Sequence, residues 1–158
     1  WYKLEETEAP AGYLKGVTYF HIGQTGEDET RPEGIGSYTT VSLKGGTHQI
    51  PNYKASIRIH KMDEEKESSS YLTGAEFALY GTPNCSETPL AVAKEDRKGI
   101  YSFELTGLTA GQEYYLKETK APDGYQLSDT VYALSFDQEG NVMLKNGNEF
   151  AQTDSGGA

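Results

Sequence analysis

The sequence predicts an all-β protein built from small sandwich domains, and three observations support this prediction. Segments rich in β-branched and aromatic residues alternate with turn residues, and no stretch carries a helical apolar period of useful length. The 158 residues include 18 Gly and 12 Tyr, a composition that favours strands and turns over helices. Apolar residues make up 35% of the chain, so each core should be thin, as in small sandwiches.

The segment around which the chain is organised runs from Tyr114 to Leu127 and reads YYLKETKAPDGYQL. Tyr114, Leu116 and Glu118 share one strand parity, so their side chains should point to one face. Because Tyr and Leu mark that face as the core face, Glu118 is expected to point into the core. A carboxylate there needs a partner or a proton. The Pro and Gly that follow should end the strand in a turn.

The same pattern opens the chain, where residues 2–14 read YKLEETEAPAGYL. The two copies lie 112 residues apart, and Glu6 takes the position of Glu118. A repeat of this length fits tandem small domains better than a solenoid, whose periods run about 20–50 residues. We therefore expect residues 1–54 to be the C-terminal half of one domain and residues 55–158 to be a second domain that lacks its last strand.

Further strands are expected in both units. In the first unit they are 17–22, 38–43 and a short extended piece at 47–53, where Pro51 restricts the chain to a sheet edge or an irregular end. In the second unit they are 56–63, 75–80, 90–93, 99–105, 113–119, 131–136 and 142–144. Residues 23–36 and 82–89 are expected to be loops, and the Gly-rich tail after the last strand is expected to be loose.

The strand at 56–63, SIRIHKMD, alternates cleanly and places Lys61 on the same face as Ile57 and Ile59. Lys is almost never fully buried without a partner. Two structural explanations stay open for an inward Lys61 and an inward Glu118. They could form a buried ion pair, which is costly to desolvate, or both charged ends could curl back to the surface.

Composition excludes several functions. The net charge of −10 argues against nucleic acid and anionic membrane surfaces as partners. Cys85 is the only cysteine, so it cannot form an internal disulfide, and its loop context makes it incidental. His21, His48 and His60 show no ligand spacing, so no metal or other cofactor is expected. No signal peptide or apolar run of membrane length is present.

The pairing of I-x-I-x-K-x-D at 57–63 with Y-x-L-x-E-T-x-A-P-x-G-Y at 114–125 resembles the Cna-B type domains of Gram-positive surface proteins, found in pilins and adhesin stalks. The resemblance implies a small β-sandwich of the transthyretin-like, inverse-immunoglobulin type. It also implies an isopeptide bond between a Lys on the first strand and an Asn or Asp on the last, assisted by a Glu. Lys61 matches the family's Lys, Glu118 and Glu6 match its Glu, and Asn52 matches its acceptor.

The chemistry implied by this resemblance is physically reasonable. Burial favours the neutral amine, which is the nucleophile, and a protonated carboxyl that can shuttle a proton. The fold supplies proximity, and the reaction turns over once, so the protein is not an enzyme in the ordinary sense. The product suits a shaft under tension that has no disulfides. We expect an extracellular protein attached to the cell wall, whose partners are other domains or subunits of the same surface protein.

Neither unit matches the pattern completely. The first unit has no equivalent of Lys61. In that unit Asn52 lies 46 residues after Glu6, and the same distance counted from Glu118 gives position 164, which is beyond the 158 residues of this chain. The acceptor for Lys61 is therefore not expected within this chain, and Asn52 of the same chain is too close in sequence to serve. Two explanations stay open: a piece of a longer tandem array, or a strand donated by another chain, for which residues 45–54 have the right character.

Three other residues carry little weight as acceptors for Lys61: Asn146, Asn148 and Asp154. The alternative function is a ligand-binding adhesin module that recognises a host matrix protein or glycan through the loops at 23–36 or 82–89. These loops have few aromatic residues, which argues against a strong sugar site. No calcium-loop, phosphate-loop or nucleophile motif supports an enzyme or a metal protein.

Overall fold

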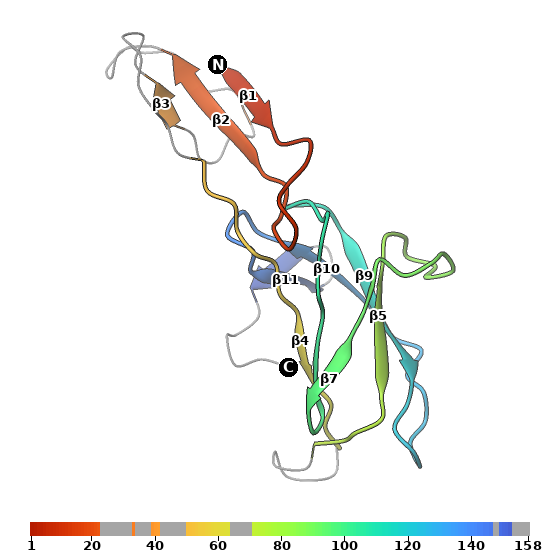
Figure 1. The fold of residues 1–158 in the computed structure, drawn as a ribbon. Helices are drawn as coiled ribbons and strands as arrows, with labels where there is room; N and C mark the ends of the chain where they lie inside the picture. Colours follow the sequence, from red (N-terminus) through yellow and green to blue (C-terminus); the bar gives the residue numbers. More distant parts are fainter. Residues whose placement is uncertain (23–32, 34–38, 42–49, 64–70, 147–148, 153–158) are drawn as a thin grey trace.

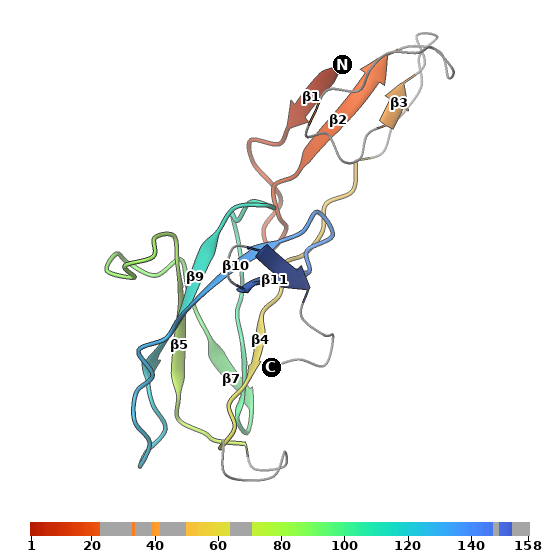
Figure 2. The same ribbon diagram turned by 180° about the vertical axis from the view of Figure 1, so that it is seen from behind.

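The fold was obtained as a computed structural model that describes residues 1–22, 33, 39–41, 50–63, 71–146 and 149–152. All regular structure in these residues is β (Figures 1 and 2). The strands are β1 Tyr2–Glu5, β2 Val17–Ile22, β3 Thr39–Val41, β4 Arg58–His60, β5 Glu76–Tyr80, β6 Ala91–Val92, β7 Lys94–Arg97, β8 Ile100–Ser102, β9 Tyr114–Lys120, β10 Val131–Phe136, β11 Val142–Asn146 and β12 Glu149–Gln152.

The strands form three sheets with the orders β1-β2-β3, β12-β11-β10-β9-β5-β6 and β4-β8-β7. The first sheet, here called the N-terminal sheet, lies at one end of an elongated molecule (Figures 1 and 2). The other two pack as the layers of a β-sandwich, which confirms the predicted all-β sandwich fold. All pairs of adjacent strands are antiparallel except β2 and β3, which are parallel.

The sandwich core fills the space between its two layers. Ile57, Tyr101 and Phe103 come from the β4-β8-β7 side, and Leu79, Tyr114, Leu116, Leu134 and Phe136 come from the larger sheet. Strand β9 alternates between buried and less buried residues, so Tyr114, Leu116 and Glu118 all point inward, as the sequence parity predicts. The inward direction of the Ile57 face is likewise as predicted, since Ile57 is buried and Arg58 is exposed.

The two halves of the sequence repeat adopt the same local structure. Tyr2 pairs with Phe20, 18 residues further along, and Tyr114 pairs with Leu134, 20 residues further along, so both copies form antiparallel hairpins, with two more residues in the second. Each hairpin strand ends in a turn in which a Tyr N–H donates to the Pro carbonyl three residues earlier, at 3.0 Å in both copies. The Gly of each turn has positive φ, 83° at Gly12 and 84° at Gly124, which an L side chain rarely adopts. The partial second copy stays a prediction, which this likeness supports.

The N-terminal sheet joins the sandwich through the segment that follows its first turn. Leu14 is only 3% exposed and belongs to the sandwich core. Its N–H donates to the Tyr53 carbonyl at 2.9 Å, while the Lys15 N–H donates to the Leu108 carbonyl at 2.9 Å. At Gly140, an added Cβ would meet the Lys54 carbonyl oxygen at 2.2 Å, so no side chain fits between these backbones. This inter-unit joint is therefore closely packed.

Two sequence expectations about strands were wrong. Residues 94–97 form β7, which the sequence analysis missed because all four side chains are exposed and charged, with no apolar alternation. The tail is not loose throughout, because residues 149–152 pair with β11 as β12. Residues 50–53 form no strand, which agrees with the expected restriction of this piece by Pro51 to a sheet edge or an irregular end.

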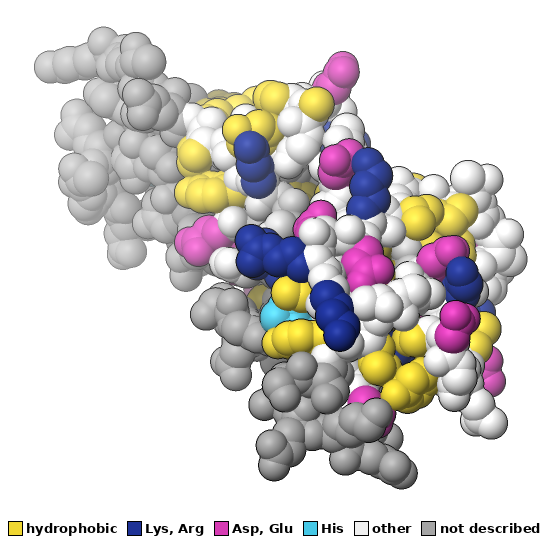
Figure 3. All heavy atoms as spheres, turned by 60° about the horizontal axis from the view of Figure 1, so that its bottom comes forward, with side chains coloured by type: hydrophobic (Ala, Val, Ile, Leu, Met, Phe, Trp, Pro, Cys, Tyr) yellow, Lys and Arg dark blue, Asp and Glu magenta, His cyan; other side chains and the backbone are white. Residues whose placement is uncertain are grey.

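The surface mixes charges of both signs. On the face shown in Figure 3, basic and acidic side chains alternate with apolar ones over the described part of the molecule. Among the residues that the structure describes, no helix is long and apolar enough to cross a membrane.

Candidate functional site

Lys61 and Glu118 form an ion pair inside the sandwich. Lys61 directly follows β4 and Glu118 lies on β9, so the pair joins the two layers. The Lys61 Nζ atom lies 2.9 Å from Oε1 of Glu118, and the side chains are 25% and 4% exposed. The sequence alone is compatible with a buried ion pair or with two charged ends that curl back to the surface. Here the carboxylate is buried and the amine reaches it from a partly open side.

The second oxygen of Glu118 is held by the backbone. Glu118 Oε2 accepts a hydrogen bond from the Ser128 N–H at 3.0 Å, ten residues further along the chain. The turn between them is fixed to the strand that bears Lys61, because the Tyr125 hydroxyl donates to Asp63 at 2.7 Å. Ser128 was not predicted from the sequence, because it acts through its backbone N–H, which has no residue-type signature. Asp63 is the Asp of the I-x-I-x-K-x-D motif, but nothing in the sequence indicates its role. The sequence signal for the Ser128 backbone donor is its distance of ten residues from the Glu, which recurs in the first copy.

Glu6 forms the matching arrangement in the N-terminal unit. Its Oε2 atom accepts a hydrogen bond from the Gly16 N–H at 3.2 Å, again ten residues further along. The same oxygen accepts a hydrogen bond from Nδ2 of Asn52 at 2.7 Å, although 46 residues separate the two in sequence. Asn52 also donates to the Leu14 carbonyl at 3.4 Å. Both side chains are half-buried.

The structure therefore holds two incomplete and complementary sites. Glu118 has a Lys partner and Glu6 has an Asn partner, so each site contains what the other lacks. Within the described residues, no hydrogen bond or ion pair joins Asn52 to Lys61. The four residues that the sequence analysis selected thus form two separate pairs, and the bond-forming roles assigned to them stay predictions.

A cavity of about 510 Å³ lies beside Glu6 and Asn52. It is bordered by the end of β1, the start of β2, residues 50–53, and Ala110 and Gln138 of the sandwich. The size falls within the range of about 300–1,000 Å³ that ligand sites occupy. The cavity thus opens directly onto the carboxyl and amide groups.

The other candidate residues do not form a site. Cys85 lies in an ordered loop, and burial raises the pKa of its thiol, which keeps it in the unreactive form. Glu87 holds this loop by accepting hydrogen bonds from Gly81 N–H and from the backbone and hydroxyl of Thr82. No group of three His, Cys, Asp or Glu in the described part of the chain could hold a metal ion.

Some predicted candidates cannot be placed. Five of the predicted candidates lie outside the described residues: Asn148, Asp154, His48, the loop at 23–36 except residue 33, and residues 45–49 of the segment at 45–54. Asn146 ends β11 in the larger sheet.

Comparison with known families gives one match. A family model described as the SpaA prealbumin-like fold domain matches residues 55–149. The chain belongs to this family. SpaA prealbumin-like domains have the Cna-B-like fold found in Gram-positive pilins, so this chain carries a structural module of the pilin and surface-protein kind. The SpaA match contains Lys61 and Glu118 but not Glu6 or Asn52.

Among solved structures, this chain is similar to the Bacillus anthracis TIE protein, at 24% sequence identity and a TM-score of 0.44. The similarity covers 87% of this chain but only 22% of that one, so the chain spans about a fifth of the protein that it matches. No curated protein matches the chain.

Proposed function

We propose that this chain is a load-bearing module of a Gram-positive surface protein, a pilin or an adhesin stalk, stabilised by a self-catalysed Lys–Asn or Lys–Asp isopeptide bond at Lys61. The observation that carries the proposal is the ion pair between Lys61 and Glu118, in which the carboxylate is 4% exposed and the two atoms lie 2.9 Å apart. A buried carboxyl beside an amine is the arrangement that lets one proton move between them.

The reaction conserves atoms and charge. One proton passes from the Lys61 ammonium to Glu118, which leaves a neutral amine and a carboxylic acid. The amine attacks the carbonyl carbon of an Asn side chain and a C–N bond forms. Glu118 gives its proton to the former amide nitrogen, which leaves as ammonia, and takes one proton from the newly bonded nitrogen, so Glu118 ends protonated. With Asp as acceptor, water leaves instead. Each molecule reacts once, so the protein is not a turnover enzyme.

The acceptor would come from a strand that adds to the free side of β4. Within the described residues β4 pairs only with β8, so its other edge offers unpaired backbone groups. Strand addition would place an acceptor side chain next to Lys61. Residues 45–54 of another copy have the extended character and the Asn that such a strand needs. A further part of the same surface protein is the other source.

The direct test is the intact mass of the purified chain under denaturing conditions, with and without a synthetic peptide of residues 45–54. We expect a chain–peptide product, and chain dimers at high concentration, each lighter by one ammonia per bond formed. The product should be lost in Lys61→Ala and slowed at least a hundredfold in Glu118→Gln, since general acid–base groups contribute about 10²–10⁴ in rate.

Glu118→Gln is the informative variant because it keeps the side-chain volume and an acceptor for the Ser128 N–H. Lys120→Ala is the matched control, since Lys120 lies on the same strand with its side chain 58% exposed. A cross-link that persists in Lys61→Ala, or that forms equally fast in Glu118→Gln, would contradict the proposed chemistry.

The same reasoning supports an extracellular, cell-wall-attached location, in which the partners are neighbouring domains or subunits. A covalent staple between the first and last strands of a domain lies across the line of pull, which explains how a protein without disulfides could resist unfolding under load. Recognition of a host matrix protein or glycan through the loops remains an untested alternative.

A further inference from the structure

The outer face of the β4-β8-β7 sheet carries a cluster of cations, although the net charge of the chain is −10. Arg58 on β4 and Lys94 on β7 both pair with Ser102 on β8, so these three residues form one row across the sheet. Their side chains face outward, because the next residue, Tyr101, is buried in the core and side chains alternate along a strand. The two cations therefore stand on either side of Ser102, with their backbones about 10 Å apart.

A β-bulge brings a third cation to this face. The register of β7 shifts just before Arg97, so Arg97 pairs with Ile100 of β8. In a regular strand Asp96 would take that position, and the face would carry an acidic side chain there. His60 of β4 pairs with Ile100 from the other side, so Arg97 and His60 form a second row beside the first.

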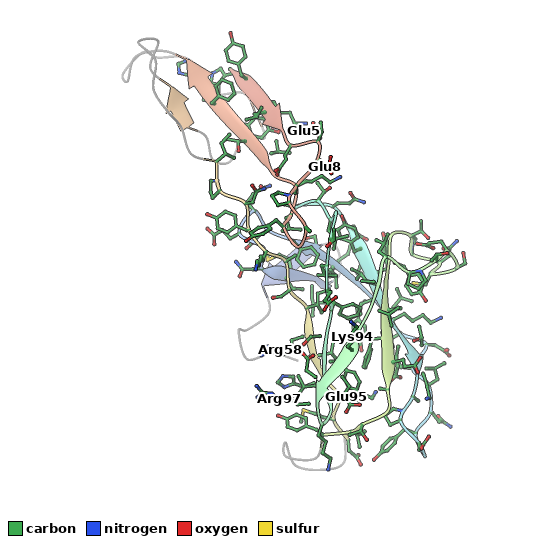
Figure 4. All side chains as sticks on the ribbon, in the orientation of Figure 1. Glu5, Glu8, Arg58, Lys94, Glu95 and Arg97 are labelled. Atoms are coloured by element: carbon green, nitrogen blue, oxygen red, sulfur yellow. The ribbon has the colours of Figure 1, made fainter. Side chains whose placement is uncertain are left out.

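These cations have few acidic partners. Figure 4 shows Arg58, Lys94 and Arg97 around β4 and β7. Within the described residues, neither Arg58 nor Arg97 forms an ion pair. Lys94 lies 3.8 Å from Glu104, but the two side chains are 74% and 89% exposed, so this pair contributes little. Because neighbouring like charges repel, a bound anion would stabilise the cluster.

The surface between the cations has features that suit a sugar chain. Among the described residues, the buried hydroxyl of Ser102 has no hydrogen-bond partner, which is unusual for a buried polar group. Ile100 is half-buried, and the ring of His60 meets the half-buried Tyr71 edge-on, with centroids 5.6 Å apart. Apolar and aromatic surface with a few polar groups is the usual composition of a site that binds polyhydroxylated ligands.

Two other kinds of polyanion fit this face less well. A polypeptide that binds to a sheet adds to its edge through backbone hydrogen bonds, and a sheet face offers no free backbone groups. Nucleic acid carries a phosphate on every nucleotide, so an acidic chain repels it beyond the small cationic cluster. Anionic groups spaced along a sugar chain match a few cations at separate positions.

We propose that the outer face of the β4-β8-β7 sheet binds a linear polysaccharide that carries sulfate or carboxylate groups. Arg58 and Arg97 each hold one anionic group through two parallel hydrogen bonds, and Lys94 attracts a third as a point charge. The sugar chain lies along β8, and the Ser102 hydroxyl donates to one of its oxygens when Arg58 and Lys94 turn toward the ligand. This site uses neither Lys61 nor the free edge of β4, so it does not depend on the proposed isopeptide bond.

The test measures the binding of a fluorescently labelled heparin oligosaccharide to the full chain by fluorescence anisotropy. We expect saturable binding in about 0.1 M salt that weakens as the salt concentration rises, because exposed charges are screened. Arg58→Gln combined with Arg97→Gln should weaken the affinity about tenfold or more, since two charge-assisted contacts are lost. Both arginines are exposed, so the fold should persist, which circular dichroism checks.

Lys117→Gln combined with Lys120→Gln is the matched control. Both lysines lie on β9 in the other sheet, and their loss changes the net charge by the same amount. This variant should change the affinity less than about twofold, because only long-range charge effects remain. Uncharged dextran should not bind.

The proposal is overturned if heparin does not bind, or if the two double variants weaken its binding equally, because net charge alone would then explain the effect. It is also overturned if polyglutamate or single-stranded DNA of similar length binds as tightly as heparin, since the partner would then be an acidic polypeptide or a nucleic acid. Once heparin binding depends on the two arginines, hyaluronan, which has only carboxylates, and dextran sulfate, which has only sulfates, identify the preferred anionic group.

Discussion

Leu14→Ala should destabilise the sandwich, although Leu14 belongs to the N-terminal sequence repeat. The side chain is 3% exposed and is part of the sandwich core. Its neighbours Tyr13 and Lys15 are held by backbone pairing to Lys54 and Thr109, so the site cannot easily collapse around a shortened side chain. Removal of a buried leucine under such conditions costs about 2–5 kcal/mol.

Urea denaturation followed by circular dichroism measures this change. A loss of about 3 kcal/mol with a slope of about 2 kcal/mol per molar lowers the midpoint by about 1.5 M. Leu4→Ala is the matched control, since Leu4 is 45% exposed in the same repeat. Substitution of an exposed residue away from special features changes stability by about 0.5 kcal/mol or less.

Equal shifts in the two variants would refute the reasoning, because they would mean that Leu14 contributes no more packing than an exposed residue. The reasoning would also be refuted if Leu14→Ala changed the urea midpoint measured by Trp1 fluorescence but left the midpoint measured by circular dichroism unchanged. Leu14 would then stabilise the N-terminal sheet alone.

Three further outcomes are expected. Gly140→Ala should lower the melting temperature strongly, because the position has a φ of 85° and an added Cβ would meet the Lys54 carbonyl oxygen at 2.2 Å; Gly124→Ala, with similar φ and open space, should cost only about 1 kcal/mol. Tyr101→Phe should lose about 1–3 kcal/mol in urea denaturation, because its hydroxyl accepts from one backbone N–H and donates to one carbonyl, each at 3.1 Å. Glu87→Ala should leave the loop at 82–89 open to limited proteolysis, since three hydrogen bonds to Glu87 are lost.

The repeat was the most informative feature of the sequence. It predicted the inward direction of Glu118 from strand parity, because Tyr and Leu at alternate positions define a core face in any sandwich. It also predicted that Glu6 takes the position of Glu118 in the first copy. The structure gives both residues the same backbone donor ten positions ahead. Local sequence patterns are sufficient for such features because strand and turn geometry depend on neighbouring residues.

Features that depend on tertiary packing were not predictable in this way. Strand β7 consists of exposed charged residues, and only its pairing with β8 makes it a strand. Leu14 was assigned to the repeat in which it lies, yet it packs into the other unit, since nothing in a single sequence states which core a leucine joins. The pairing of Lys61 with Glu118 and of Glu6 with Asn52 likewise depends on how the sheets pack, so the sequence did not predict two separate sites.

The inter-unit joint has a consequence for the shape of any fibre built from such units. Domains joined by a single linker swing freely by default. Here residues 13–15 and 53–54 both cross between the N-terminal sheet and the sandwich, and Gly140 packs directly against the second crossing. Contacts at several points off one axis oppose bending and twisting alike. The joint therefore holds the N-terminal sheet and the sandwich in one relative orientation, and a chain of such units would repeat the same angle and twist from joint to joint.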